Sequence, residues 1–171
     1  MAPLLRRAFR DLQGKAFEAV VYRHISSQYD ALDSSGSLKA GGRWNSRGEY
    51  EVLYTALKEE TAKAELERLA ERQGLTLDDL APRDLVSIEV SLSKVLDLTD
   101  KKILQQIGIN DNEIVGNDIS LCLEISRLAR GAGFEAILTP SATKKGAILI
   151  LFPDHLQPSS RLEVIGKKKI L

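Results

Sequence analysis

The sequence predicts a single domain of the α+β class, in which mixed, mainly antiparallel strands are flanked by helices. Residues 86–92 alternate between apolar and polar side chains, the pattern of a strand with one solvated face. Residues 57–73 are rich in helix-forming residues and carry an apolar stripe. Strands and helices lack a strict βαβ rhythm, and no repeat or long biased linker divides residues 1–171.

Further short strands are predicted where β-branched and other apolar residues stand between turn residues: 19–23, 52–56, 135–138 and 147–152. The last of these is apolar throughout, which indicates a central strand, and Pro153 is expected to end it. Residues 26–37 are polar and rich in serine, so we expect a loop there.

Three helices are predicted, each before a glycine suited to a helix C-terminus: 57–73 before Gly74, 99–106 before Gly108, and 118–130 before Gly131. Thr99 is expected to cap the second helix through its hydroxyl. The tail 166–169, a glycine followed by three lysines, is expected to be a solvated, frayed end.

Composition restricts the class of function. Lysine plus arginine balance aspartate plus glutamate at 24 each, so no net charge favours direct binding to nucleic acid or to an anionic membrane. No apolar run reaches the ~20 residues that cross a bilayer, and residues 1–10 lack the features of a signal peptide. We therefore expect a cytoplasmic protein that binds a small ligand or a protein partner.

The few cysteines and histidines give no metal-binding pattern. Cys122 is the only cysteine, which excludes an internal disulfide, and its apolar helical surroundings predict a buried side chain. His24 and His155 lie far apart and form no HExxH or similar motif. We expect no metal.

Residues 40–48, AGGRWNSRG, gather the chemistry of a binding site in nine positions. Gly41 and Gly42 would let the backbone approach a ligand, Arg43 could form a bidentate fork with phosphate, and Trp44 could offer a stacking face. A surface turn in which Trp44 fills the core and the arginines are solvated is an equal alternative. The segment matches neither a phosphate-binding P-loop nor a dinucleotide fingerprint.

Four more residues are candidates for the site. Glu65 borders the apolar stripe of its helix and can reach the edge of a cleft, Arg23 ends a strand, Tyr54 lies in an apolar strand, and Ser141 follows Pro140 in a turn. Each also has a structural explanation: a boundary glutamate, a solvated arginine, a core tyrosine and a hydrogen-bonding serine.

Together these residues resemble the RES domain, a family named for its arginine, glutamate and serine. Their order and approximate separations agree with the family pattern from about Tyr22 to Phe152: Arg23, the run 41–45, Tyr54, Glu65 and Ser141. Residues 114–118 also resemble a segment of some members, although Ile119 stands where those members carry tryptophan.

The resemblance implies the toxin of a bacterial toxin–antitoxin pair, with an ADP-ribosyltransferase-like split sheet and an activity that consumes NAD⁺ as its substrate. It implies an Xre-like helix-turn-helix antitoxin that covers the active site and carries the DNA contact. A homodimer and a toxin–antitoxin hetero-oligomer both stay open.

The resemblance also implies roles in cleaving the nicotinamide–ribose bond. Glu65 would stabilise the positive charge that develops on the ribose carbon, Arg23 would hold the pyrophosphate, and Tyr54 would stack on nicotinamide or hold its ribose. These three form the predicted catalytic group.

The predicted NAD⁺-binding group adds four residues to Arg23 and Tyr54. Arg43 would contact the pyrophosphate, Ser141 would position ribose or phosphate, and Trp44 and Asn45 would complete the binding surface.

Three functional hypotheses follow. The first is hydrolysis or phosphorolysis of NAD⁺, which depletes the cell of NAD⁺ and arrests growth. The second is transfer of ADP-ribose to a protein such as phosphoribosyl pyrophosphate synthetase, since water, phosphate and a protein side chain would attack the same carbon. The third is a non-catalytic module in which Arg43, Trp44 and Arg47 bind a nucleotide or single-stranded nucleic acid.

Overall fold

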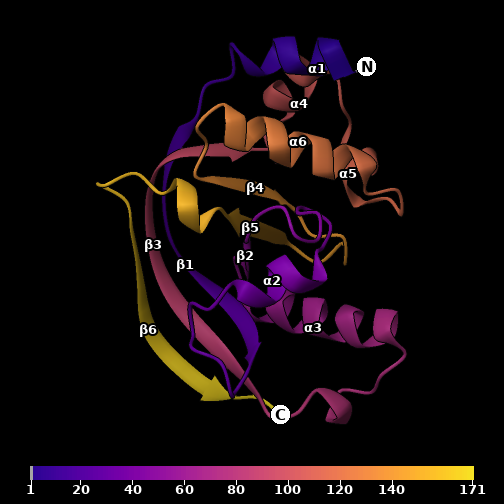
Figure 1. Ribbon diagram of the computed structural model, residues 1–171, viewed down its shortest axis with the longest axis vertical. Helices are drawn as coiled ribbons and strands as arrows, with labels where there is room; N and C mark the ends of the chain where they lie inside the picture. The colour runs from indigo at the N-terminus through magenta and orange to yellow at the C-terminus, as the bar shows by residue number, and fades with distance from the viewer. Residues whose placement is uncertain (1) are drawn as a thin grey trace.

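The structure is a computed structural model that describes residues 2–171 (Figure 1). The described residues form six strands: β1 (Lys15–Ser26), β2 (Leu53–Ala56), β3 (Arg83–Asp97), β4 (Ala136–Pro140), β5 (Ala147–Leu151) and β6 (Arg161–Lys169). Their α-helices are α1 (Ala2–Phe9), α2 (Ser35–Ala40), α3 (Glu59–Gln73), α4 (Lys101–Ile107), α5 (Asp111–Val115) and α6 (Ser120–Gly131). Two short 3₁₀ turns span Asp78–Leu80 and Pro153–His155.

The strands follow the order β1-β2-β5-β4-β3, and β1 also pairs with β3, so these strands close into a five-stranded barrel. β6 pairs with β3 as an additional strand. Every pairing is antiparallel except that of β3 with β4. The α+β class and the mainly antiparallel pairing are therefore confirmed. The split sheet that the resemblance implies is not confirmed, because β1–β3 pairing closes the ring.

The helices cover two parts of the barrel (Figure 1). Helices α1, α4, α5 and α6 gather at one end, where α5 and α6 contact β4, while α3 packs on β1 and β2. None of the helices in the described part of the chain combines the length and apolar character needed to cross a membrane.

Strand β5 shows why the barrel holds together. Ile148 and Ile150 pack in one buried cluster with the helices at the end, whereas Leu149 and Leu151 pack in a second cluster with β1 and β3. Both faces of the strand are buried, which explains its continuous apolar run. The predictions of a central strand here and of a strand with one solvated face at 86–92 are confirmed.

Two predictions about the chain's polar segments hold only in part. The tail 166–169 is not frayed: it belongs to β6 and pairs with residues 84–87 of β3. Most residues of β6, including its three lysines, are exposed, as is common for an edge strand. The loop expected at 26–37 is confirmed from residue 27 to residue 34, whereas α2 begins at Ser35, a short helix without buried residues that no apolar pattern could indicate.

The helix predictions hold with shifted ends. Gly74 and Gly108 follow α3 and α4 in the left-handed conformation, as expected for C-terminal glycines. The expected cap Thr99 is wrong, because Asp100 caps α4 by accepting a hydrogen bond from the Lys102 amide. Cys122 is buried as predicted.

Glu135 is a fully buried carboxylate that ties three segments together. Its Oε1 accepts hydrogen bonds from the amides of Ser93 and Lys94, and its Oε2 accepts one from the amide of Gln157. Burial raises the pKa of Glu135, but the hydrogen bonds it accepts outweigh burial and hold the pKa below its usual value.

We expect Glu135→Gln to lower the free energy of unfolding by about 2 kcal/mol, because the new amide group would face a backbone donor. Since the native pKa is lowered, the loss should be full at neutral pH and should shrink as pH falls through that pKa. Urea denaturation measures it, with exposed Glu71→Gln as the control. Equal stability of the two variants would contradict the role of Glu135.

Candidate active site

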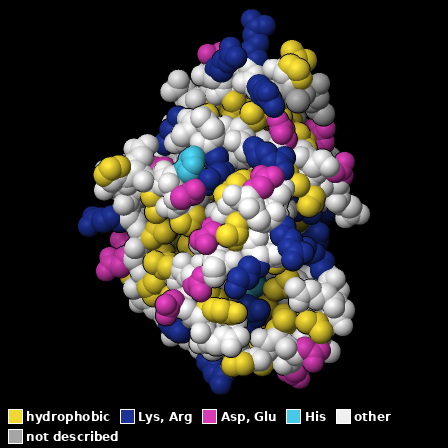
Figure 2. Space-filling model, in the orientation of Figure 1, with side chains coloured by type: hydrophobic (Ala, Val, Ile, Leu, Met, Phe, Trp, Pro, Cys, Tyr) yellow, Lys and Arg dark blue, Asp and Glu magenta, His cyan; other side chains and the backbone are white. Residues whose placement is uncertain are grey.

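A cavity of about 430 Å³ lies between β1, β2, α3 and the segment around α2. Its size is within the range of small-molecule sites. Lysine and arginine side chains gather around a hollow in the lower half of the molecule in Figure 2. Six cationic residues line the cavity: Arg23, Lys39, Arg43, Arg68, Arg72 and Arg83. Only two carboxylates, Asp33 and Glu65, line it. This balance suits a ligand with several negative charges.

Glu65 extends from α3 to the wall of the cavity, where Ser141 holds it. The Ser141 hydroxyl donates to Glu65 Oε1 at 2.5 Å and contacts the Thr143 hydroxyl at 2.6 Å. Among the described residues, nothing hydrogen-bonds Oε2. One carboxylate oxygen is therefore fixed by the protein, while the other is available to a ligand.

Ser141 itself sits in a tight turn after β4. Its amide donates to the Gly146 carbonyl, and Gly146 has a φ of 79°. Its side chain is fully buried and is not among the residues that line the cavity. In this structure the hydroxyl of Ser141 orients Glu65, and the expectation that Ser141 positions ribose or phosphate stays a prediction.

Tyr54 borders the cavity from β2, and its hydroxyl is hydrogen-bonded to residues 44 and 45. The hydroxyl donates to Asn45 Oδ1 at 2.6 Å and accepts from the Trp44 amide at 3.1 Å. Burial strongly raises the pKa of Tyr54, so the phenol stays protonated. The tyrosine can contact a ligand with its ring, but it cannot act as a base at neutral pH.

The side chains of Trp44 and Asn45 have no exposed area, although Trp44 is among the residues that line the cavity. The indole packs in the core, so the core alternative for Trp44 is the correct one. The Asn45 amide donates to the carbonyls of Ser37 and Tyr50, which satisfies both of its donors inside the protein. These residues shape the segment from within.

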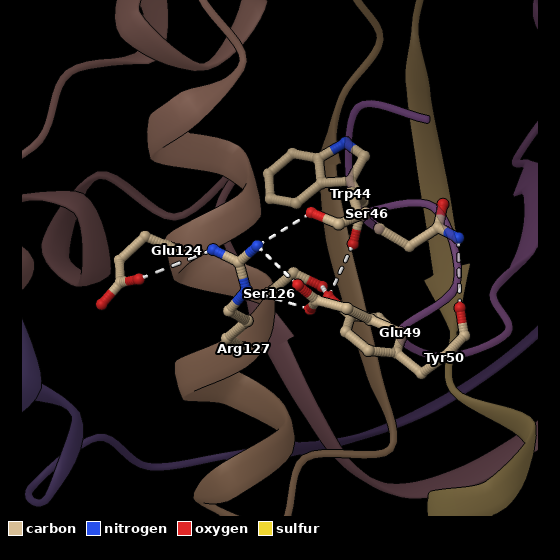
Figure 3. Close-up of polar contacts among 8 residues, drawn as sticks. Trp44, Ser46, Glu49, Tyr50, Glu124, Ser126 and Arg127 are labelled. Atoms are coloured by element: carbon tan, nitrogen blue, oxygen red, sulfur yellow. Dashed lines mark hydrogen bonds and ion pairs between the residues drawn. The ribbon is translucent and has the colours of Figure 1, made fainter. Parts of the chain in front are cut away.

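Helix α6 anchors the end of this segment (Figure 3). The Tyr50 hydroxyl contacts the Trp44 carbonyl at 3.0 Å and the Ser126 hydroxyl at 2.8 Å. Arg127 donates to Ser46 and forms a two-point contact with Glu49. The segment is thus fixed between the barrel and α6, and residues 41–44 of the segment line the cavity.

Arg23 lies in the cavity wall with Arg83 and His24. Its Nη1 donates to the carbonyls of Ala31 and Asp33 at 2.8 and 2.9 Å, while its buried Nε has no partner. Burial lowers the pKa of Arg23 to about 10, against the opposing effect of the Asp33 carboxylate. An incompletely paired guanidinium of this kind is well placed to bind an anion.

His24 contacts this cationic pair directly. Arg83 Nη1 lies 3.3 Å from His24 Nδ1, and arginine can only donate, so Nδ1 is the acceptor and the ring is neutral. Burial, together with Arg83 and Arg23, lowers the pKa of His24 to about 3. The histidine therefore supports Arg83 without adding a third charge.

A second group of arginines lines both the cavity and an adjoining depression: Arg43, Arg68 and Arg72. Arg43 Nη1 donates to the carbonyls of Ile114 and Gly116 at 3.1 and 2.6 Å. These hydrogen bonds hold the Arg43 side chain, which the sequence predicts to bind phosphate, at the end of α5. Arg68 and Arg72 follow Glu65 by three and seven residues on the same face of α3. The sequence prediction does not include four cationic residues of the cavity: Lys39, Arg68, Arg72 and Arg83. The helical spacing of Arg68 and Arg72 from Glu65 could have indicated these two.

The arrangement combines a fixed carboxylate with two groups of cations. A carboxylate stabilises a cationic centre, and the arginines can bind phosphate groups in the same cavity. No group of three or more His, Cys, Asp or Glu side chains in the described part of the chain could hold a metal ion.

Comparisons with known proteins agree on one family. A family model described as the RES domain matches residues 19–167. The NAD(+) phosphorylase MbcT of Mycobacterium tuberculosis is 28% identical over 139 residues, which cover 80% of this chain and 75% of that protein. A probable NAD(+) phosphorylase of the same species is 31% identical over 118 residues, 69% of this chain and 56% of its own length.

A solved structure has the same fold. The crystal structure of the M. tuberculosis MbcT–MbcA toxin–antitoxin complex aligns with a TM-score of 0.87 at 24% identity. The alignment covers 98% of this chain and 92% of the matched chain.

Gly42 tests how closely the segment fits against Tyr54. A Cβ at this position would lie 2.5 Å from the Tyr54 hydroxyl oxygen and 3.0 Å from its ring carbon. We expect Gly42→Ala to displace the tyrosine and lower the free energy of unfolding by about 1–3 kcal/mol. Gly36→Ala is the matched control, because nothing lies within 4 Å of its added Cβ. Equal stability of both variants in urea would contradict this close fit.

His24 predicts a pH dependence of stability. The unfolded chain takes up a proton near pH 6.5, whereas the native state resists it until about pH 3. The unfolded state therefore binds more protons in this interval, so stability is undiminished above pH 6.5 and falls as pH drops below it. We expect the slope of unfolding free energy against pH to exceed that of His24→Gln by up to ~1.4 kcal/mol per pH unit. Equal slopes would show that His24 titrates normally.

Proposed function

This chain belongs to the RES domain family, and from that premise we propose that it is a bacterial toxin that cleaves the nicotinamide–ribose bond of NAD⁺ with phosphate as the acceptor. The substrate and the acceptor are supported by MbcT, named an NAD(+) phosphorylase, and by the relative named a probable NAD(+) phosphorylase. The observation that carries the proposal is the Glu65 carboxylate, held by Ser141 at the wall of a cavity lined by cationic side chains.

The chemistry requires an anion at one point. When neutral nicotinamide leaves, positive charge develops on the ribose carbon that it was bound to. A carboxylate beside this carbon stabilises the transition state more than the ground state, and one that is already oriented needs little reorganisation. Glu65 supplies this group, and Ser141 acts as its positioning residue.

The remaining cavity residues fit the rest of NAD⁺. Arg23 and Arg83 would bind the pyrophosphate, and the ring of Tyr54 would contact nicotinamide or its ribose. Arg43 also lines the cavity, where the carbonyls of Ile114 and Gly116 hold its guanidinium. The Trp44 amide and the Asn45 side chain hold the Tyr54 hydroxyl and would position its ring beside the substrate.

The biological setting follows from the family. We propose that residues 1–171 act as one cytoplasmic unit that is neutralised by an Xre-like antitoxin. The MbcT–MbcA toxin–antitoxin complex supports an antitoxin partner. The antitoxin would supply the DNA contact, consistent with the zero net charge of this chain.

The non-catalytic binding module is disfavoured by the same geometry. Its stacking platform, Trp44, is fully buried, and Arg43 is tied to backbone carbonyls. ADP-ribose transfer to a protein uses the same Glu65 chemistry, so the identity of the product separates it from phosphorolysis.

We expect Glu65→Gln to lower the rate of NAD⁺ consumption by about a hundredfold or more and to abolish toxicity, because the neutral amide cannot stabilise the developing cation. Ser141→Ala should cause a smaller loss in kcat, since the carboxylate remains but is no longer held. Nicotinamide release by purified protein, followed by chromatography, measures both effects.

Glu67→Gln is the matched control for this experiment. Glu67 lies two residues along the same helix with its side chain exposed to solvent, so NAD⁺ consumption should stay at the wild-type rate. Circular dichroism would establish that all variants are folded. A folded Glu65→Gln protein that consumes NAD⁺ at the wild-type rate would refute the proposed role.

A further inference from the structure

We propose that Arg68 and Arg72 of α3, together with Arg43, form the site that binds the attacking phosphate. This inference rests on the proposed function and names the site of its second substrate. A depression lined by Arg43, Arg68, Arg72, Asn117 and Ile119 adjoins the main cavity and shares these three arginines with it. No carboxylate lines this depression.

Arg68 lies beside the catalytic carboxylate because both are tied to the same turn. The Ser141 hydroxyl donates to Glu65, and the carbonyl of the next residue, Ala142, accepts a hydrogen bond from Arg68 Nη1 at 3.3 Å. Neighbouring residues of one turn therefore hold the carboxylate and the guanidinium. An anion bound by Arg68 would lie next to the carbon that Glu65 stabilises.

The charges of this cluster are not neutralised inside the protein. Among the described residues, ion pairs occupy Arg127 and Arg130, yet none involves Arg43, Arg68 or Arg72. Arg43 and Arg68 donate only to carbonyl oxygens, which leave their positive charge in place. Three cations without a carboxylate partner line one depression, which is the composition of an anion site.

NAD⁺ does not account for both cationic groups. Its pyrophosphate would occupy Arg23 and Arg83, which lie on β1 and β3, whereas the Arg68 cluster lies on α3 and the segment before β2. A phosphate anion beside Glu65 would otherwise be repelled by the carboxylate, and cations between or next to the two charges remove that cost. Water as the acceptor would need no such cluster.

The reaction balances without any further reactant. A phosphate oxygen forms a bond to the ribose carbon, the bond from that carbon to the pyridinium nitrogen breaks, and its electron pair neutralises the nicotinamide. The products are nicotinamide and ADP-ribose bearing a phosphate on the former nicotinamide ribose. Nothing is oxidised or reduced, and any proton left on the new phosphate ester passes to solvent.

The test compares Michaelis constants for the two substrates. Initial rates are measured with inorganic phosphate and NAD⁺ varied separately for wild type, Arg68→Gln and Arg72→Gln. We expect the KM for phosphate to rise by about tenfold or more in each variant, the loss of one charge-assisted contact, while the KM for NAD⁺ changes by less than about twofold. Arg161→Gln, an exposed arginine on β6, is the matched control and should keep both constants.

Two outcomes would overturn the inference while leaving NAD⁺ cleavage intact. One is a KM for NAD⁺ that rises as much as the KM for phosphate, which would assign these arginines to the dinucleotide. The other is a wild-type rate that does not respond to phosphate at matched ionic strength.

A binding measurement keeps the inference testable if wild type consumes no NAD⁺ and the proposed function fails. Inorganic phosphate should raise the Tm of the wild-type protein relative to chloride of equal ionic strength. The double variant Arg68→Gln, Arg72→Gln should lose this increase, and Arg161→Gln should retain it. An unchanged phosphate effect in the double variant would contradict the site.

Discussion

The hydrogen bond from Ser141 to Glu65 depends on the position of β5 between β2 and β4. The glutamate follows β2, the serine follows β4, and 76 residues separate them in sequence. β5 pairs with both strands and so brings the two segments together. Without this neighbourhood Glu65 would be an ordinary boundary residue of a surface helix. The apolar β5, buried on both faces, is therefore as important to the site as the residues that line it.

Charge around Glu65 explains how one cavity could serve two anionic substrates. Arg23 and Arg83 are held by backbone carbonyls and a neutral His24, and Arg43 and Arg68 are likewise held by carbonyls. Carbonyl contacts orient a guanidinium without cancelling its charge, whereas the carboxylate contacts of surface arginines do cancel it. The protein thereby keeps its cations ready for ligands at the cost of partly buried charge.

The periodicity of apolar residues predicts the helices and strands whose burial depends on their own side chains. The α3 and β5 segments follow from periodicity, and Glu65 follows from its angle beside the apolar stripe. The pairing of the lysine-rich β6 depends on a free edge of β3, and the residues of β6 itself carry no pattern that indicates this edge. The sequence allows Trp44 either to stack on a ligand or to pack in the core, because composition does not show which side of a turn faces inward. The position of Arg68 beside the site follows only from its contact with the turn at 141–146, which lies far from it in sequence.

In the proposed function, NAD⁺ binds with its nicotinamide ribose against Glu65. A crystal structure of the Glu65→Gln variant with NAD⁺ tests this directly, because the substitution should preserve the substrate. We predict the reacting ribose carbon within about 4 Å of the residue 65 side chain, with the pyrophosphate on Arg23 and Arg83. A dinucleotide bound elsewhere, or bound in the cavity with its ribose turned away from residue 65, would contradict the account.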